Sequence, residues 1–222
     1  MRTPVALFIF NRPEATARVF AEVARARPPR LLVVADGPRE GVAGEAERCA
    51  AARAAAGRVE WDCELLTNYS DVNLGCGRRV AGGLDWVFAA TEEAVILEDD
   101  CVPHPTFFRF CDELLEKYRD DERVMHVGGS DFLLGARRAR YSYRFSRYAL
   151  VWGWASWRRA WRNYDAGLNL WPGLRGTDWL LDVHGDRAAA AYWARVLDDV
   201  RAGRIDTWDY QWLFACWAAG GL

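Results

Sequence analysis

Three acidic residues in succession, Glu98, Asp99 and Asp100, follow the apolar run AVIL at 94–97. Adjacent like charges repel by roughly 1 kcal/mol per pair in water, and by several times that beside a low-dielectric wall. A divalent cation bound by one or two of these carboxylates would offset the repulsion, and Mg²⁺ or Mn²⁺ held in this way together with substrate phosphates fits oxygen-ligand chemistry. The alternative is an acidic loop that is exposed to water.

The elements expected to position these carboxylates alternate between strands and helices. Apolar runs of strand length lie at 5–10, 30–37 and 94–97, and 59–66 alternates in period two before turning apolar. Helices are expected at about 12–26, at 45–57, and from the glycine-rich turn 73–77 to about residue 90. This order predicts an α/β fold with a mixed, mostly parallel sheet and helices on both faces.

The first helix carries a start signal of its own. Asn11 can cap it, Glu14 lies in the capping-box position, and Pro13 suits a first turn. A strand is therefore expected to lead directly into this helix.

Ligands of open α/β sheets bind at the carboxyl ends of the strands, where Asp36 and the acidic triplet both fall. Because side chains alternate along a strand, Glu98 and Asp100 should share one side while Asp99 faces the other. The three carboxylates therefore need not share one ligand. This position after a buried strand favours the metal-site interpretation over the exposed loop.

The second half of the chain is expected to extend the same sheet. The stretch 106–118 predicts a helix that faces the core, and 123–130 and 140–146 predict two further strands. Ten of the twelve tryptophans lie beyond residue 150, and Trp154, Trp157 and Trp161 fit helical spacing. Packing explains most of them, although aromatic faces can also stack on sugar rings. The final stretch LFACWAAGGL reads as an amphipathic helix with a glycine stop.

The totals restrict the class of protein. A chain of 222 residues with half of them apolar can form one domain with a full core, and a net charge of −2 gives no reason to expect a nucleic-acid partner. The six cysteines include no C-x-x-C pair, which favours thiols in a reducing compartment. The N-terminal apolar run is too short for a signal or membrane span, so a cytoplasmic location without a transmembrane segment is expected, with peripheral membrane association left open.

Five segments together resemble a known enzyme family. VILEDDCVPHPTFFRF, FNRPE, ADGPR, GWASW and TWDYQW are similar, in the same order, to segments of the GT-A glycosyltransferases of the N-acetylglucosaminyltransferase I type and of related bacterial sugar transferases. The resemblance implies a GT-A (Rossmann-like) fold in one domain spanning 1–222. About 1–105 would bind the nucleotide-sugar, and about 106–222 would form an acceptor-side half that is C-terminally incomplete. The expected activity is metal-dependent transfer of a sugar from a nucleotide diphosphate, a UDP-sugar above all, to a saccharide or other hydroxyl acceptor.

The resemblance also implies a role for individual residues. Asp100 would bind the cofactor, Mn²⁺ or Mg²⁺, while Glu98 and Asp99 would hold the ribose or the water shell of the metal. The nucleotide would contact Arg12 and Asp36, with Asn11 nearby. Asp209 would act as the general base of an inverting transfer, taking the proton of the acceptor hydroxyl. The family often adds a histidine ligand near the C-terminus, which would lie beyond Leu222.

The residues themselves leave some of these roles open. Asp209 can equally be a simple helix cap, and Asp206 is a rival for the base. An arginine at a helix start, as at Arg12, is disfavoured by the helix dipole and indicates a bound acidic ligand. Arg78 and Arg79 can meet a diphosphate or be solvated. The three histidines lack metal-ligand spacing and read as structural or surface residues; they are His104, His126 and His184.

Two other functions remain in competition. A nucleotidyltransferase that makes a sugar nucleotide usually has a glycine-rich loop after the first strand, whereas FNRPEATAR contains no glycine. A non-catalytic carbohydrate-binding protein would keep the fold and the aromatic surface but show no turnover.

Overall fold

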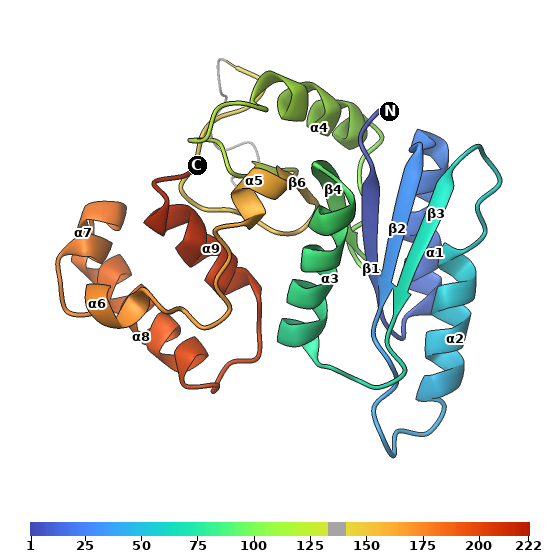
Figure 1. Ribbon diagram of the computed structural model, residues 1–222, viewed down its shortest axis with the longest axis horizontal. Coiled ribbons are helices and arrows are strands. Elements are labelled where there is room, and N and C mark those ends of the chain that lie inside the picture. Colours follow the sequence, from blue (N-terminus) through green and yellow to red (C-terminus); the bar gives the residue numbers. More distant parts are fainter. Residues whose placement is uncertain (133–140) are drawn as a thin grey trace.

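The computed structural model describes residues 1–132 and 141–222. Six strands in the described part form one sheet in the order β3-β2-β1-β4-β6-β5 (Figure 1). The parallel strands are β1 (Val5–Ile9), β2 (Arg30–Ala35), β3 (Glu64–Tyr69) and β4 (Glu93–Glu98). Strand β6 (Trp154–Trp157) runs antiparallel to β4, and β5 (Val127–Gly128) pairs antiparallel with β6 at the edge. The predicted mixed, mostly parallel sheet is confirmed.

Helices cover both faces of this sheet, as predicted. On one face α1 (Pro13–Ala26), α2 (Glu45–Ala56) and α4 (Thr106–Lys117) pack on Val5, Leu7 and Ile9 of β1. On the other face α3 (Cys76–Ala90), α5 (Arg158–Trp161) and α9 (Asp209–Ala218) pack on Ala6 and Phe8. Every residue of β1 is buried, which is why this strand reads as a continuous apolar run.

The C-terminal helices form a third core beside the sheet. It unites α6 (Trp171–Leu174), α7 (Trp179–His184) and α8 (Arg187–Arg201) with one side of α9. Because α9 contributes to two cores, all of its residues from Gln211 to Trp217 are buried. The prediction of an amphipathic final helix is therefore wrong: α9 is apolar on nearly every side, as expected of a helix enclosed by protein.

The capping box predicted for the first helix does not form. Helix α1 begins at Pro13, as expected, but its N-cap is Arg12 and no side chain caps it. The amide of Asn11 instead donates to Glu45 Oε1 at 2.8 Å. Glu45 is fully buried, so its carboxylate requires hydrogen-bond donors, and this demand outweighs local capping.

The predicted strand at 59–66 begins later, at Glu64, and runs to Tyr69. Before it, Trp61 packs on Phe20 of α1 and donates its indole N–H to the carbonyl of Pro28 at 2.9 Å. This tertiary contact holds the chain away from the sheet until Glu64.

Two predictions for the second half are wrong, and one is only partly right. Residues 141–146 contain no strand, and residue 140 lies outside the described residues. Trp154 and Trp157 belong to strand β6 rather than to a helix, since pairing with β4 buries both indoles completely or nearly so. The strand expected at 123–130 is reduced to Val127–Gly128.

Candidate functional site

Arg12 joins the end of β4 to the start of α1. Its guanidinium closely contacts Oδ1 of Asp99 and donates from Nη1 to Oδ2 of Asp100 at 3.0 Å. Asp99 is only 2% exposed and also accepts the backbone N–H of Phe10 at 3.2 Å. Burial raises the pKa of Asp99, and the charge of Arg12 opposes this rise. The side chains of Arg12 and Asp100 remain half exposed.

Glu98 faces the opposite side of the sheet, toward α3 and α9. Burial, then repulsion by Asp100 and Asp99, raises its pKa to about 7, with Arg12 opposing and Asp209 adding to the rise. The alternation predicted for the triplet is therefore confirmed for Glu98 and Asp99. The predicted place of Asp100 on the side of Glu98 is not confirmed: Asp100 lies in the turn after β4 and pairs with Arg12, as Asp99 does.

The segment before α9 is tied to the start of α3 across the molecule. Asp206 Oδ1 accepts the backbone N–H of Gly77 at 3.1 Å, although the two residues are 129 positions apart. A Cβ added at Gly77 would lie 2.5 Å from that same oxygen and 2.9 Å from the carbonyl oxygen of Thr207. The glycine-rich turn is therefore required for this close approach, which brings α9 to the acidic end of β4.

Asp209 is the first residue of α9, but it does not cap the helix. The N-cap is Trp208, no side chain makes a capping bond, and Asp209 Oδ1 accepts a close hydrogen bond from the hydroxyl of Thr207. The charge of Asp209 acts on Glu98, which places the two carboxylates in the same electrostatic environment. The capping interpretation of Asp209 is wrong.

Cys76 lies among these carboxylates, and its sequence context alone gives it no role. The residue is exposed overall, but partial desolvation of its thiol raises the pKa to about 11, and four carboxylates add to this rise: Glu98, Asp206, Asp209 and Asp36. The thiol is therefore protonated at neutral pH and presents a weak donor to the site. The signal available in the sequence was its place in the glycine-rich turn NLGCG.

Asp36, at the carboxyl end of β2, organises this same turn. Its carboxylate accepts the N–H groups of Gly37 and Leu74 at 2.9 Å each, and also those of Gly75 and the Asn73 amide. The side chain is 6% exposed. In this structure Asp36 therefore shapes the start of α3, and contact with a nucleotide stays a prediction.

The neighbouring polar residues also make hydrogen bonds within the protein. Asn11 binds Glu45, which accepts from the Arg39 guanidinium and backbone, and these hydrogen bonds lower the pKa of Glu45 to about 2. Arg79 is buried and donates to the carbonyl and side-chain oxygens of Asn68 at 2.5 and 2.9 Å, so it clamps α3 to β3. Arg79 is therefore not the solvated side chain considered as an alternative, and its contact with a diphosphate stays a prediction, whereas Arg78 is exposed.

Two of the histidines make contacts within the protein, His104 at the surface and His126 in the core. His104 contacts the hydroxyl of Thr106 at 2.8 Å on the surface. The ring of His126 stacks on Trp154, accepts from the Trp212 indole at 3.3 Å and contacts the Leu150 carbonyl at 3.1 Å.

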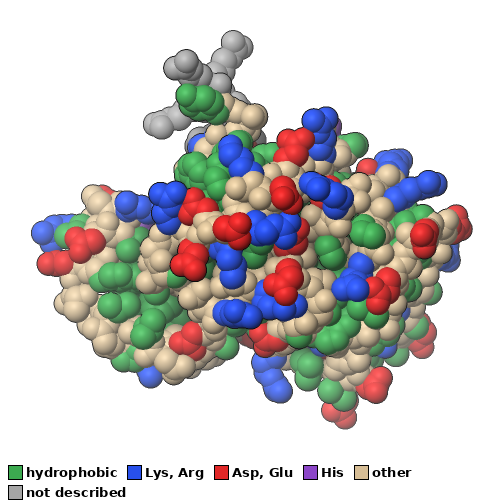
Figure 2. Space-filling model, turned by 45° about the horizontal axis from the view of Figure 1, so that its top comes forward, with side chains coloured by type: hydrophobic (Ala, Val, Ile, Leu, Met, Phe, Trp, Pro, Cys, Tyr) green, Lys and Arg blue, Asp and Glu red, His purple; other side chains and the backbone are tan. Residues whose placement is uncertain are grey.

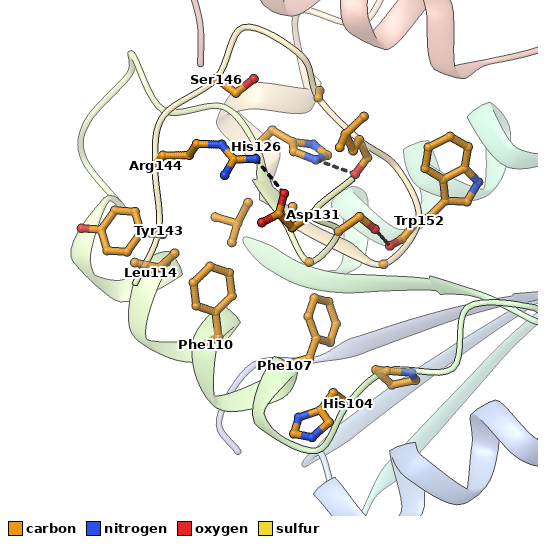
Figure 3. Close-up of a pocket in the computed structure, with 18 of the residues that line it drawn as sticks. His104, Phe107, Phe110, Leu114, His126, Asp131, Tyr143, Arg144, Ser146 and Trp152 are labelled. Atoms are coloured by element: carbon orange, nitrogen blue, oxygen red, sulfur yellow. Dashed lines mark hydrogen bonds and ion pairs between the residues drawn. The ribbon is translucent and has the colours of Figure 1, made fainter. Parts of the chain in front are cut away.

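A large pocket opens beside the acidic triplet. It has a volume of about 1200 Å³ and extends from Asp100 past α4 to the chain before β6. Figure 3 shows Phe107 and Phe110 projecting into it from α4, with Trp152 on another wall. Asp131 and Arg144 form an ion pair of 2.9 Å across it. The pocket thus joins planar apolar surfaces to a few polar groups, which is typical of small-molecule sites.

The donor set limits how a metal ion could bind. Among residues 1–132 and 141–222, no three His, Cys, Asp or Glu side chains converge closely enough to hold one by themselves. A cation would therefore need ligand oxygens besides those of Asp100. Mg²⁺ and Mn²⁺ meet this condition, because one or two carboxylates and the phosphates of a substrate suffice for them. The carboxylate of Asp100 is half exposed and fits such an ion. It acts on Glu98, whose pKa is raised by burial first and then by Asp100 and Asp99.

Basic and acidic side chains are interspersed over the face in Figure 2, which shows no extended area of one sign. No helix in the described part of the chain is long and apolar enough to cross a bilayer. No protein-family model matches the chain, and no curated protein matches it in sequence.

Proposed function

We propose that this protein is a metal-dependent glycosyltransferase with a GT-A fold. It moves a sugar from a nucleotide diphosphate, most simply a UDP-sugar, to the hydroxyl of a saccharide or other acceptor. The sheet order and the acidic end of β4 support the proposal, since open α/β sheets bind ligands at the carboxyl ends of their strands.

The observation that carries the proposal is the contact between two distant segments: Asp206, just before α9, accepts the N–H of Gly77 at the start of α3 at 3.1 Å. This contact holds Asp209, the first residue of α9, near enough to Glu98 at the end of β4 for its charge to add to the rise in the pKa of Glu98. A transfer reaction needs a base on one side of the anomeric carbon and an acidic, cation-binding end on the other. The two segments supply these two parts.

The chain's own residues then divide the work of an inverting transfer. Asp209 takes the proton of the acceptor hydroxyl while the oxygen of that hydroxyl bonds to the anomeric carbon. The bond from that carbon to the diphosphate oxygen breaks on the opposite face, and its electron pair leaves with the diphosphate. Thr207 fixes one oxygen of Asp209 by its hydrogen bond and leaves the other to accept the proton.

Asp100 is the residue that would bind Mn²⁺ or Mg²⁺ directly, and Glu98 would contact the water shell of the ion or the ribose. When bound, the cation stabilises the negative charge that develops on the departing diphosphate. Arg12 keeps Asp100 oriented and neutralises Asp99, so the acidic end of β4 can be preserved before any ligand binds.

Thermal unfolding tests this proposal with a panel of nucleoside diphosphates, each with and without Mn²⁺. A ligand of the folded state stabilises it by about 2.7 kcal/mol at a hundredfold excess over its Kd. We expect a rise in Tm with UDP and Mn²⁺ together that is lost in Asp100→Ala. Asp120→Ala is the matched control, because Asp120 is exposed just beyond the far end of α4.

Turnover separates the transferase from its alternatives. We expect hydrolysis or transfer from a UDP-sugar in the wild type and its loss in Asp209→Asn, with UDP and Mn²⁺ still bound. Formation of a sugar nucleotide from a nucleoside triphosphate would instead establish a nucleotidyltransferase. No response to any nucleotide, together with binding of saccharides, would establish a carbohydrate-binding protein.

A further inference from the structure

The pocket beside Asp100 exposes more aromatic surface than the fold explains. Trp152 is 55% exposed, whereas Trp154 and Trp157, a few residues later, are 0% and 2% exposed. The same segment therefore directs two indoles into the core and one into the pocket. Other pocket-lining aromatic residues are also exposed, namely Phe132, Tyr141, Phe145 and Tyr148. Phe132 packs edge-on against Trp152, and exposed aromatic surface that lines one pocket in this way points to a binding site.

The chain holds Trp152 in this outward position. The hydroxyl of Ser130 donates to its carbonyl at 2.8 Å, and the N–H of Gly129 donates to the carbonyl of Gly153 at 2.9 Å. Gly153 has a positive φ of 74°, a conformation that suits glycine and turns the chain from Trp152 into β6. The indole is thus presented by a segment that is fixed on both sides.

The polar groups of the pocket limit the chemistry of its ligand. The Asp131–Arg144 ion pair bridges the pocket, and the hydroxyl of Tyr143 accepts from Lys117 at 2.6 Å on its outer side. A wholly apolar ligand would remove water from the ion pair without replacing its hydrogen bonds, which is costly. A pyranose ring has an apolar C–H face for an aromatic platform and hydroxyl groups for the polar rim. This alternation matches the pocket.

Asp100 connects the pocket to the acidic end of β4. Asp100 lines the pocket, and its carboxylate also forms an ion pair with Arg12. We infer that the pocket binds a saccharide whose pyranose ring stacks on Trp152, in a subsite next to Asp100. This inference rests on the proposed transferase function for the neighbouring donor site and specifies the occupant of the pocket as a sugar rather than a lipid or a protein side chain.

Saccharide binding to Trp152 variants tests the subsite. The probes are the methyl glycosides of glucose, galactose, mannose and N-acetylglucosamine, with a zwitterionic alkyl detergent as the apolar comparator. Binding is measured by calorimetry or ligand-observed NMR. We expect at least one glycoside to bind, with a Kd that rises about tenfold in Trp152→Ala and about threefold in Trp152→Phe. Tyr192→Ala, which removes a 48% exposed aromatic ring on α8, should leave this Kd unchanged.

The response of each variant to UDP and Mn²⁺ is measured in parallel. Both Trp152 variants should keep it, which shows that they are folded. A protein that binds UDP with Mn²⁺ but none of the glycosides, or only the detergent, overturns the subsite and leaves the donor function standing. Equal glycoside affinity in Trp152→Ala and wild type also overturns it. Glycoside binding that depends on Trp152 in a protein without a UDP response supports the saccharide pocket and overturns the donor function.

Discussion

Replacing Arg12 by methionine should destabilise the protein in a pH-dependent way. The substitution keeps most of the apolar stem of the side chain but removes the guanidinium between Asp99 and Asp100. Asp99 is 2% exposed and would keep one backbone donor, the N–H of Phe10. Arg12→Met therefore leaves a buried carboxylate beside two others without its cation.

The magnitude follows from the burial of the two partners. Unit charges about 3 Å apart attract by about 5 kcal/mol at an effective dielectric constant of about 20. Removing one partner of a buried pair lowers the free energy of unfolding by about 3–5 kcal/mol. Because the Arg12 side chain is half exposed, we expect the loss to lie near the lower value, about 3 kcal/mol. Asp99 can limit the cost by binding a proton, which costs about 4 kcal/mol at pH 7 but only about 1.5 kcal/mol at pH 5.

The sign of the pH effect follows from proton binding. Loss of Arg12 raises the pKa of Asp99 further in the folded state, so the folded variant binds a proton that the unfolded chain releases. The variant should lose stability as the pH rises from about 5 to 7, and the destabilisation should grow from about 1.5 to about 3 kcal/mol.

Urea unfolding at pH 5 and pH 7, with EDTA present to exclude divalent cations, measures both values. Arg109→Met is the control: it breaks an exposed pair with Glu113 on α4 and should cost less than about 0.5 kcal/mol at either pH. Adding Asp99→Asn to Arg12→Met should restore most of the loss at pH 7. A cost for Arg12→Met no larger than that for Arg109→Met, or a cost equal at the two pH values, would show that Arg12 does not neutralise a buried Asp99.

Three further predictions concern the core and the site. Gly83→Ala should lower the free energy of unfolding in urea by about 1–3 kcal/mol, because its Cβ would lie 2.5 Å from the ring of Phe8 in the core. Gly82→Ala has open space around it and should stabilise α3 by up to about 1 kcal/mol. Equal effects of the two substitutions would contradict this prediction. Burial lowers the pKa of His126 to about 4 from 6.5, so the unfolded state binds the proton first. Stability should therefore fall by up to about 3 kcal/mol between pH 6.5 and 4, and His126→Gln should remove that part of the slope. Thr207→Val should lower kcat for UDP-sugar turnover about tenfold while Thr207→Ser keeps it, and equal rates would show that the hydroxyl does not position Asp209.

The parallel half of the sheet could be predicted because its signals are local. Strands buried on both faces must be apolar throughout, as 5–10 and 94–97 are, and the β-α-β order then places the acidic triplet at a ligand-binding edge. The opposite directions of Glu98 and Asp99 follow from strand alternation alone. These inferences need no knowledge of which strands are neighbours.

The second half could not be predicted in the same way, because its structure depends on distant partners. Trp154 and Trp157 have a spacing that fits a helix, yet pairing with β4 makes the segment a strand. The hydrogen bond between Asp206 and Gly77 leaves no local trace except the glycine itself. Asn11 likewise looks like a cap until a buried Glu45 is seen to compete for its amide.

The division of the triplet explains how three adjacent carboxylates are tolerated. Asp99 is neutralised from the α1 side by Arg12 and by a backbone donor, so it is part of the framework. Burial, and then its negative neighbours Asp100, Asp99 and Asp209, raise the pKa of Glu98 to about 7, although Arg12 opposes the rise. Asp100, half exposed beside them, is the carboxylate that a cation can reach from solvent.

A cation at Asp100 would lower the pKa of Glu98 as it binds. The affinity for the cation should therefore increase between pH 6 and 8, and Glu98→Gln should abolish this increase. Isothermal titration with Mn²⁺ and UDP at these two pH values measures the difference, and an affinity that does not change with pH would show that Glu98 is not coupled to the cation.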